Sequence, residues 1–476
     1  MASRSQRHAN AVGLQRFGLG VKIGQAEALL DGARDLILNE IRADSIARPA
    51  GIAYVGTADI STAFYAFADA EKKAREAPRV AQANVPATPG AGADGGAATP
   101  RPPAEPPLPT RIYRDEVMAR TRLALEAPAG FGERLVQFWS NHFCVAVNKN
   151  TTTRIMAGAF EREAIRPHVF GRFADMLLAA ESHPAMLEYL DNQLSTGPNS
   201  PAGNRRGRGL NENLGREILE LHTLGVGGGY TQADVTSLAR IITGWMVAPR
   251  NGALGTPGVF AFNPRIHEPG AQQLLGKLYD QPDKAQGVAA LADLARHPAT
   301  ARFVATKLVR HFVADEPPAA LVDDIAAAFR RSEGDLAVVS RALVESDAVW
   351  SAEPAKIRSP QEFLIAAFRA LGREPDAGQV LGTLGVMGQP VWQPPGPNGY
   401  PDTNAAWASP QGLKTRIDVA ARLGQQAAGG IADPRQLSEE ILGPLLTPET
   451  RQAVARAESK PQALALLLMS PEFQRR

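Results

Sequence analysis

The chain has 476 residues, of which 44% are hydrophobic and 21% are charged, so it can bury a large core and lacks the composition of a disordered protein. Its 51 basic and 49 acidic residues leave a formal net charge of +2, which gives no global electrostatic reason to bind nucleic acid or an anionic membrane. The single cysteine, Cys144, excludes an internal disulfide and a cysteine-based zinc site, and its apolar context predicts a packed, inert thiol.

The first 20 residues are polar and basic, and they contain neither the apolar core of a secretory signal nor a twin-arginine pair. No later stretch reaches about 18 uninterrupted apolar residues, so no transmembrane helix is expected. We therefore expect a cytoplasmic protein. Export is the alternative if the true start of translation lies upstream.

Helical spacing of apolar residues in the N-terminal part predicts helices over 25–43 and 59–78. The composition then changes to Ala, Pro and Gly with few large apolar side chains. Such a segment cannot bury enough surface to offset the entropy lost on ordering it, so 80–110 is predicted to be a disordered insertion. The piece before it is small for a domain of its own. We expect the insertion to interrupt one domain that spans 1–476.

Helical patterns dominate the rest of the chain. Thr231 with Asp234, and Ser359 with Glu362, have the spacing of N-terminal helix caps. The predicted helices cover 113–127, 130–144, 152–165, 168–181, 184–190, 212–224, 232–245, 283–297, 299–314, 318–331, 335–346, 360–371 and most of 417–476.

No stretch shows sustained strand alternation, which argues against Rossmann and barrel folds. The predicted fold class is therefore mainly α, a multi-helical globular domain with long, ordered Gly/Pro-rich loops and the disordered insertion. The predicted loops are 192–210, 247–282 with a short hairpin near 258–278, and 388–410. The last loop contains Trp392 and Trp407. It is either a surface for a partner or glycan or, as we favour, a plug that packs onto the helices.

Several motifs, spread from near residue 10 to the C-terminal part, together resemble one known family. They are Arg16-Phe17-Gly18, Phe138-Trp139-Ser140-Asn141-His142-Phe143, His183-Pro184-Ala185-Met186-Leu187, the block from Asn211 to Trp245, Phe262 to His267, Lys307-Leu308 with His311-Phe312, and Arg358-Ser359-Pro360 with Glu362. On these motifs the chain is similar to the bacterial family of domain of unknown function 1800. Where the family pattern has His-Asp, this chain has His267-Glu268, which keeps a carboxylate on a longer arm.

The resemblance implies no established activity, so whether the chain is an enzyme stays open. Members of that family are often exported. They occur with a second uncharacterised family that is similar to sulfatases, so the resemblance implies a functional pairing with such a protein.

The predicted helix 212–224 carries the densest group of polar candidates. Arg216, Glu217 and Glu220 are the candidate catalytic residues: Glu217 or Glu220 would act as the base beside the Arg216 cation, and carboxylate clusters with perturbed pKa values are probabilistic markers of a site. A solvated charged face with ion pairs between successive turns explains the same pattern without chemistry.

One interpretation of the polar groups is a metal-assisted enzyme. His142, His222 and His267 would be the ligands, with Glu217, Glu220 or Glu268 supplying a carboxylate, a mixture that suits a transition metal. The spacing supports this poorly, since residues 220 and 222 lie about 200° apart on an α-helix.

A second interpretation is a site for an anion such as phosphate, sulfate or a sugar acid. Arg216 would contribute, and the candidate ligand-binding residues are Asn213, Lys277, Arg358 and Arg416. A third interpretation is structural: Arg216 and Glu217 cross-link helices in a non-catalytic interaction scaffold. If a site exists, we expect it between helix 130–144, helix 211–225 and loop 262–277.

Overall fold

The computed structural model describes residues 4–25, 30–83, 105–206 and 209–476. Helices make up most of these residues, and the strands form only two short antiparallel ribbons, which confirms the mainly α fold class. No helix in the described ranges is long and apolar enough to cross a membrane.

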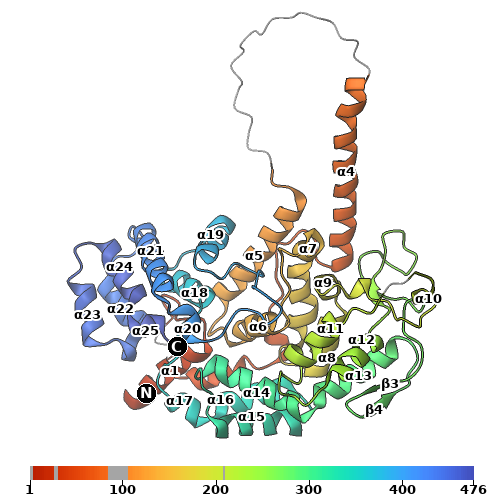
Figure 1. Ribbon diagram of the computed structural model, residues 1–476. Coiled ribbons are helices and arrows are strands. Elements are labelled where there is room, and N and C mark those ends of the chain that lie inside the picture. Colours follow the sequence, from red (N-terminus) through yellow and green to blue (C-terminus); the bar gives the residue numbers. More distant parts are fainter. Residues whose placement is uncertain (1–3, 26–29, 84–104, 207–208) are drawn as a thin grey trace, which may run out of the picture.

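The first half of the chain is built from short and medium helices (Figure 1). In chain order they are α1 (Arg4–Phe17), α3 (Ala33–Asn39), η1 (Ala43–Ser45), α4 (Thr57–Ala83), α5 (Leu108–Glu126), α6 (Phe131–His142), α7 (Thr151–Phe160), η2 (Glu161–Ile165), η3 (Arg166–His168), α8 (Phe173–Ser182), α9 (Pro184–Tyr189), η4 (Asn192–Leu194), α10 (Gly203–Arg206), α11 (Asn213–Glu217), η5 (Ile218–His222) and α12 (Gln232–Ile241).

Two ribbons separate this half from a second set of helices. The strands are β1 (Trp245–Val247), β2 (Phe260–Phe262), β3 (Gln272–Leu274) and β4 (Lys277–Tyr279). The helices are α13 (Lys284–Arg296), α14 (Pro298–Phe312), α15 (Ala319–Arg331), α16 (Leu336–Glu345), α17 (Asp347–Ser351), α18 (Pro360–Leu371), α19 (Ala377–Val386), α20 (Asn404–Trp407), α21 (Pro410–Ala427), α22 (Pro434–Leu442), η6 (Gly443–Leu445), α23 (Pro448–Ala455), α24 (Lys460–Met469) and α25 (Pro471–Gln474).

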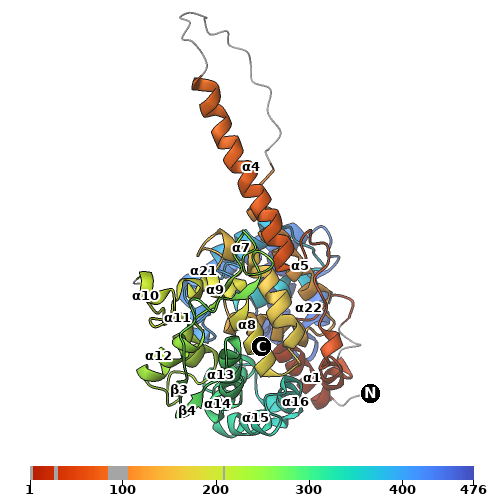
Figure 2. The same ribbon diagram turned by 90° about the vertical axis from the view of Figure 1, so that its right-hand side faces the viewer.

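The N-terminal part differs from the prediction in its boundaries. Helix α1 was not predicted, because three of its core positions are the polar residues Asn10, Gln15 and Arg16, which hide its apolar face. Helix α4 extends through Ala83 and stands away from the body of the protein (Figures 1 and 2). Helix α5 already begins at Leu108, so α4 and α5 each extend into an end of the predicted insertion 80–110. Residues 84–104 of the predicted insertion lie outside the described residues.

The two predicted helix caps are confirmed. At the start of α12, the Thr231 hydroxyl accepts from the Asp234 backbone N–H while the Asp234 carboxylate accepts from the Thr231 N–H. At the start of α18, Ser359 and Glu362 make the same reciprocal pair. Each cap satisfies backbone donors that a helix start leaves free, which explains why the spacing identified both starts.

The region 245–279 is paired differently from the predicted hairpin near 258–278. Strand β2 pairs with β1, with Ala261 opposite Met246, and β3 pairs with β4 in a separate ribbon. Because β1 lies within the predicted helix 232–245 and the loop after it, apolar periodicity gave no signal for this three-residue strand.

The predicted helix 212–224 contains a change of helical pitch. Helix α11 ends at Glu217 and continues as the π-helical turn η5, with Leu224 N donating to Leu219 O at 3.0 Å. A π turn holds one more residue than an α turn, so the side chains after 217 are rotated from the faces that α periodicity predicts. This rotation directs His222 into the core, where it is 1% exposed.

One hydrophobic cluster of buried residues extends from Ala11 to Phe473. Its centre includes Phe17, Phe131 and Phe312, whose rings lie 5.4–5.6 Å apart. Helices α1, α6 and α14 therefore meet at the same place, although 295 positions separate Phe17 from Phe312. This meeting point supports one wall of the cavity described next.

Candidate functional site

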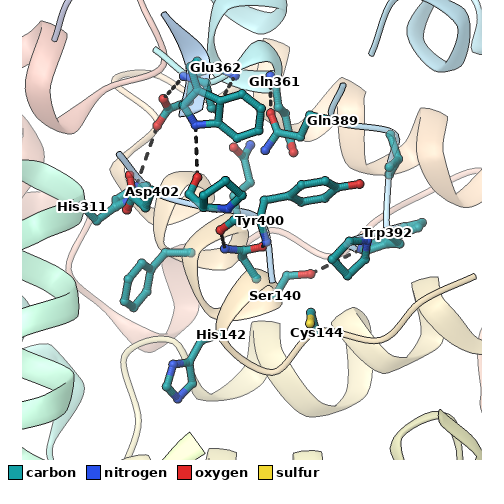
Figure 3. Close-up of a pocket in the computed structure, with 18 of the residues that line it drawn as sticks. Ser140, His142, Cys144, His311, Gln361, Glu362, Gln389, Trp392, Tyr400 and Asp402 are labelled. Carbon is teal, nitrogen blue, oxygen red and sulfur yellow. Dashed lines mark hydrogen bonds and ion pairs between the residues drawn. The ribbon is translucent and has the colours of Figure 1, made fainter. Parts of the chain in front are cut away.

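A cavity of about 120 Å³ lies between α6, α14, the start of α18 and the loop 388–403 (Figure 3). Its lining is mixed, with aromatic side chains and a ring of polar ones. The polar members discussed below are Arg120, Gln137, Asn141, His142, Lys307, Arg310, His311, Glu362, Asp402 and Arg476.

The start of helix α6 is held in place by the carboxylate of Glu40, the residue that follows α3. Glu40 accepts four backbone N–H groups, those of Ala129, Gly130, Phe131 and Gly132, at 2.7–3.3 Å. An anion at a helix start satisfies free donors and complements the helix dipole. The C-terminal end of α6 is thereby aimed at the cavity, and it supplies Asn141 and His142.

The loop 388–403 closes the opposite wall. Asn141 and Tyr400 exchange two hydrogen bonds, from the Asn141 amide to the Tyr400 carbonyl at 3.0 Å and from the Tyr400 N–H to the Asn141 amide oxygen at 2.7 Å. Gly399 has φ +77°, and a Cβ there would lie 2.5 Å from the Asn141 carbonyl oxygen, so only glycine lets the loop approach α6 this closely.

Trp392 of this loop and Trp407, at the end of α20, are both buried. The Trp392 indole donates to the Ser140 hydroxyl at 3.3 Å, and the Trp407 indole donates to the Pro401 carbonyl at 3.1 Å. The interpretation of 388–410 as a plug is therefore confirmed. The consequence is that loop and helices together form the cavity.

Helix α14 presents three basic side chains to the cavity. Lys307, Arg310 and His311 are three and four residues apart, which places them on one face of the helix. No ion pair joins Lys307 or Arg310 to a carboxylate of the described residues, whereas Arg134, Arg166, Lys356 and Arg476 each have one. The cavity wall therefore carries positive charge without a protein counter-ion.

Lys307 is half-buried and contacts a histidine. Its Nζ lies 2.9 Å from Nδ1 of His142. Burial lowers the pKa of the Lys307 ammonium to about 8, and burial together with the Lys307 charge holds the pKa of His142 well below 6.5. His142 is thus neutral and accepts from Lys307 at Nδ1. Its Nε2–H donates to the His222 carbonyl at 3.1 Å.

Beside His142 lies a second buried histidine, His222, which has the buried carboxylate of Glu181 as its partner. His222 Nδ1 is 2.7 Å from Glu181 Oε1, and the two side chains are 1% and 0% exposed. The His142 and His222 rings lie 6.1 Å apart. Two of the three predicted metal-ligand histidines therefore meet, but Glu181 of α8 is the carboxylate at ion-pair distance, in the place where Glu217 was expected.

The other side of the cavity is formed by a network of paired charges. Glu362 accepts from Arg134 at 2.8 Å and from Arg476 at 2.9 Å. Burial raises the pKa of the Glu362 carboxyl, but Arg476 and Arg134 outweigh it and bring the pKa to about 2. Glu362 is therefore ionised and saturated with donors.

His311 and Asp402 extend this network. His311 Nδ1 lies 2.7 Å from Asp402, and Arg134 lies 3.2 Å from His311 Nε2. Burial opposes ionisation of Asp402, yet His311, Arg476 and Lys356 hold its pKa well below 3.8. Both ring nitrogens of His311 have partners, so the ring is oriented and has no free lone pair.

Cys144 lies in the same lining but is not activated. Its thiol is directed at the carbonyls of Gly396 and Pro397 at 3.5 and 3.3 Å, and burial raises its pKa to about 12. The interpretation as a packed, inert thiol agrees with this geometry.

The predicted catalytic residues lie on α11 and η5, where all three are partly buried. Arg216 pairs with Glu212 at 3.2 Å and with Gln232 at 3.0 Å, and Glu220 accepts a hydrogen bond from Tyr230. Glu217 is half-buried, and burial raises its pKa. None of the three lines the cavity.

The four predicted ligand-binding residues are spread over three places. Asn213 is exposed, Lys277 pairs with Asp293 at 2.5 Å, and Arg358 and Arg416 are buried beside Phe473 and Gln474.

The third predicted metal ligand, His267, contacts the Thr243 carbonyl at 2.8 Å. Glu268 is buried and accepts from Asn199, so it anchors loop 192–210 to the ribbon region. Among the described residues, no group of three or more His, Cys, Asp or Glu side chains is arranged to hold a metal ion.

Lys307, Glu181 and Asp402 were missed as site residues. Lys307 and His311 had a usable signal, the spacing of two basic residues on one face of a predicted helix. Glu181 and Asp402 had none, because their partners are 41 and 91 positions away.

Of the three elements between which a site is predicted, helix 130–144 borders this cavity, whereas no residue of helix 211–225 or loop 262–277 is in its described lining. The cavity lies against α14, α18 and the loop 388–403.

The family model described as "Protein of unknown function (DUF1800)" matches residues 13–475, which confirms the resemblance drawn from the sequence motifs. No curated protein and no solved structure matches the chain.

Proposed function

The chain belongs to the family of proteins of unknown function DUF1800, and we propose that it binds a small anionic molecule in the cavity between α6, α14, α18 and loop 388–403. Lys307 is the cation that recognises the anion, and Arg310 assists. The observation that carries the proposal is the unpaired ammonium of Lys307 at the cavity wall, whose hydrogen-bond acceptor among the described residues is the neutral ring of His142.

A cation removed from bulk water without a counter-ion is costly to the fold, and burial lowers the pKa of Lys307 for this reason. The ammonium has three N–H donors, of which His142 uses one. The remaining donors are suited to one or two oxygen atoms of a bound anion.

The charges around the cavity favour the same sign of ligand. Glu362 and Asp402 are the only carboxylates of the described lining, and both are saturated by arginine, lysine and histidine donors. The cations of the lining are Arg120, Lys307, Arg310 and Arg476, so positive groups outnumber negative ones by four to two.

The residues on the cavity wall favour binding over covalent chemistry. The two ring nitrogens of His142 and of His311 have partners, and burial raises the pKa of the Cys144 thiol far above neutral pH. Neither histidine is positioned as a free base, and the thiol is not a nucleophile.

A structural role is the second candidate, and a different observation favours it. Arg134, Glu362 and Arg476 join α6, α18 and the segment after α25 through contacts of 2.8 and 2.9 Å, and Arg369 caps the end of α5 through the carbonyls of Ala124, Leu125 and Ala127. Such a network cross-links helices without chemistry.

Thermal unfolding in the presence of sodium salts separates the two candidates. The proposal expects that acetate, propionate or phosphate raises Tm in a saturable way, because a ligand that binds only the folded state stabilises it. The shift should disappear in Lys307→Met and persist in Lys277→Met, a matched lysine that is exposed and paired with Asp293. Equal shifts in the wild type and both variants, or no shift with any salt, would favour the structural role.

A further inference from the structure

A second, smaller cavity adjoins the main one. It has a volume of about 10 Å³, and most of its lining is apolar side chains of α5, α18 and α19, with Arg120, Thr121, Gln137 and Gln361 as its polar members. We call it the apolar slot. The residues of its wall used here are Val117, Ala124, Leu364, Val380 and Leu384.

The two cavities are continuous in their lining. Arg120, Gln137, Gln361 and Val391 line both of them. A molecule held at Lys307 in the main cavity can therefore direct its other end past Gln137 into the slot. The polar wall ends where the apolar wall begins, which is the pattern of a site for a molecule with one charged and one apolar end.

Gln137 lies on this boundary with an unused donor. Its amide nitrogen is buried and has no hydrogen-bond partner among the described residues. A buried donor without an acceptor is rare in folded proteins because it loses its bond to water. An oxygen atom of the ligand would satisfy it.

We infer that the ligand is a short aliphatic carboxylate that carries an oxo or hydroxyl oxygen along its chain. Its carboxylate contacts Lys307, its chain oxygen accepts from the Gln137 amide, and its terminal methyl group enters the apolar slot. This inference rests on the proposed function, since the carboxylate is the anion that Lys307 recognises.

The dimensions set a limit on the chain. A volume of about 10 Å³ is close to the smallest that admits one water-sized group. The slot therefore accepts a methyl group but not a long tail. The bulk of the molecule occupies the main cavity, whose 120 Å³ is limited as well.

Calorimetric titration of the full chain with unbranched carboxylates, from acetate to octanoate, tests the chain length. Affinity is expected to rise about three- to fourfold for each added methylene until the methyl group fills the slot, and to fall beyond that length. The 2-oxo and 3-hydroxy derivatives at the optimal length are expected to bind more tightly than the unsubstituted acid, and Gln137→Leu should remove that preference.

Two slot variants give opposite expectations. Ala124→Val fills the slot and should shift the optimum to a shorter chain, whereas Leu384→Ala enlarges it and should shift the optimum to a longer one. Val386→Ala is the matched control, because this residue lies on the same helix but is 62% exposed. If one slot variant fails to fold, the other still shows whether the optimal chain length shifts as expected.

The outcomes distinguish the inference from the proposed function. Binding that needs Lys307 but shows no dependence on chain length, or an optimum that neither slot variant moves, overturns the inference and leaves the anion site intact. Absence of binding by every carboxylate while phosphate still binds through Lys307 overturns the inference alone. Absence of binding by every carboxylate and by phosphate, in wild type as in Lys307→Met, overturns the proposed function and the inference with it.

Discussion

Nζ of Lys307 and Nδ1 of His142 lie 2.9 Å apart and join α14 to α6 across 165 positions of the chain. The contact determines which His142 nitrogen carries the hydrogen, because Nδ1 accepts and Nε2 therefore donates to His222. It also leaves the ammonium beside the cavity without a carboxylate. Charge, tautomer and cavity wall thus depend on one pair of side chains.

Lys307→Met is expected to stabilise the ligand-free protein at about pH 7 by about 1–2 kcal/mol, since it removes a poorly solvated charge at the cost of one hydrogen bond. Folding lowers the pKa of Lys307 from 10.5 to about 8, so the unfolded chain binds more protons between these values. The wild type should therefore gain stability as pH rises from about 8 to 10.5, and the variant should not.

Urea unfolding at neutral and alkaline pH measures this difference, with Lys277→Met as the exposed control. A variant that is less stable than wild type at every pH would contradict the description of Lys307 as an unpaired charge.

Glu362→Gln is expected to destabilise the protein by about 3–5 kcal/mol, because it leaves Arg134 and Arg476 buried without their counter-ion. Glu439→Gln, in an exposed pair with Arg451, should cost at most about 1 kcal/mol. Denaturant midpoints of the two variants give the comparison. Similar losses of stability in the two variants would show that the buried ion pairs of Glu362 stabilise the protein no more than an exposed pair does.

Acid unfolding should depend on the same carboxyl. Its pKa falls from 4.5 to about 2 on folding, so its stabilising contribution is present above about pH 4.5 and is lost as pH falls toward 2. The slope of stability against pH in this window should be shallower in Glu362→Gln than in the wild type. Titration curves followed by circular dichroism check it; parallel slopes would contradict the pairing.

Glu181 and His222 are expected to be strongly coupled. Removing either partner alone, as in Glu181→Leu or His222→Phe, should destabilise by about 3 kcal/mol or more, and the double substitution should recover a large part of the loss. A double-mutant cycle of unfolding free energies measures the coupling. Additive losses would mean that the 2.7 Å contact contributes nothing of its own.

Cys144 is expected to resist thiol reagents in the folded state. The thiolate is the reactive form, and a pKa of about 12 leaves almost none of it near neutral pH. Labelling with a chromogenic disulfide should be slow in native buffer and immediate in concentrated guanidinium chloride. Rapid labelling of native protein would show that the loop 388–403 opens readily.

The sequence by itself determined the features that depend on neighbouring residues. Reciprocal caps at Thr231 and Ser359 identified two helix starts because a cap is complete within four residues. Apolar periodicity identified the mainly α class, and motifs along the chain identified the family. Helix α1 was not predicted because its buried face is partly polar. The π turn η5 was not predicted because α periodicity does not contain the extra residue of a π turn.

Only the tertiary structure decided which side chains meet. Charged groups on the helix 212–224 suggested a site by their density, yet they lie outside the cavity, while Lys307 and Asp402 line it. The partners of His142, His222 and Glu362 are 165, 41 and 114 positions away along the chain. Contacts over such separations depend on how the helices pack around the shared core. The spacing of residues within one helix does not predict that packing.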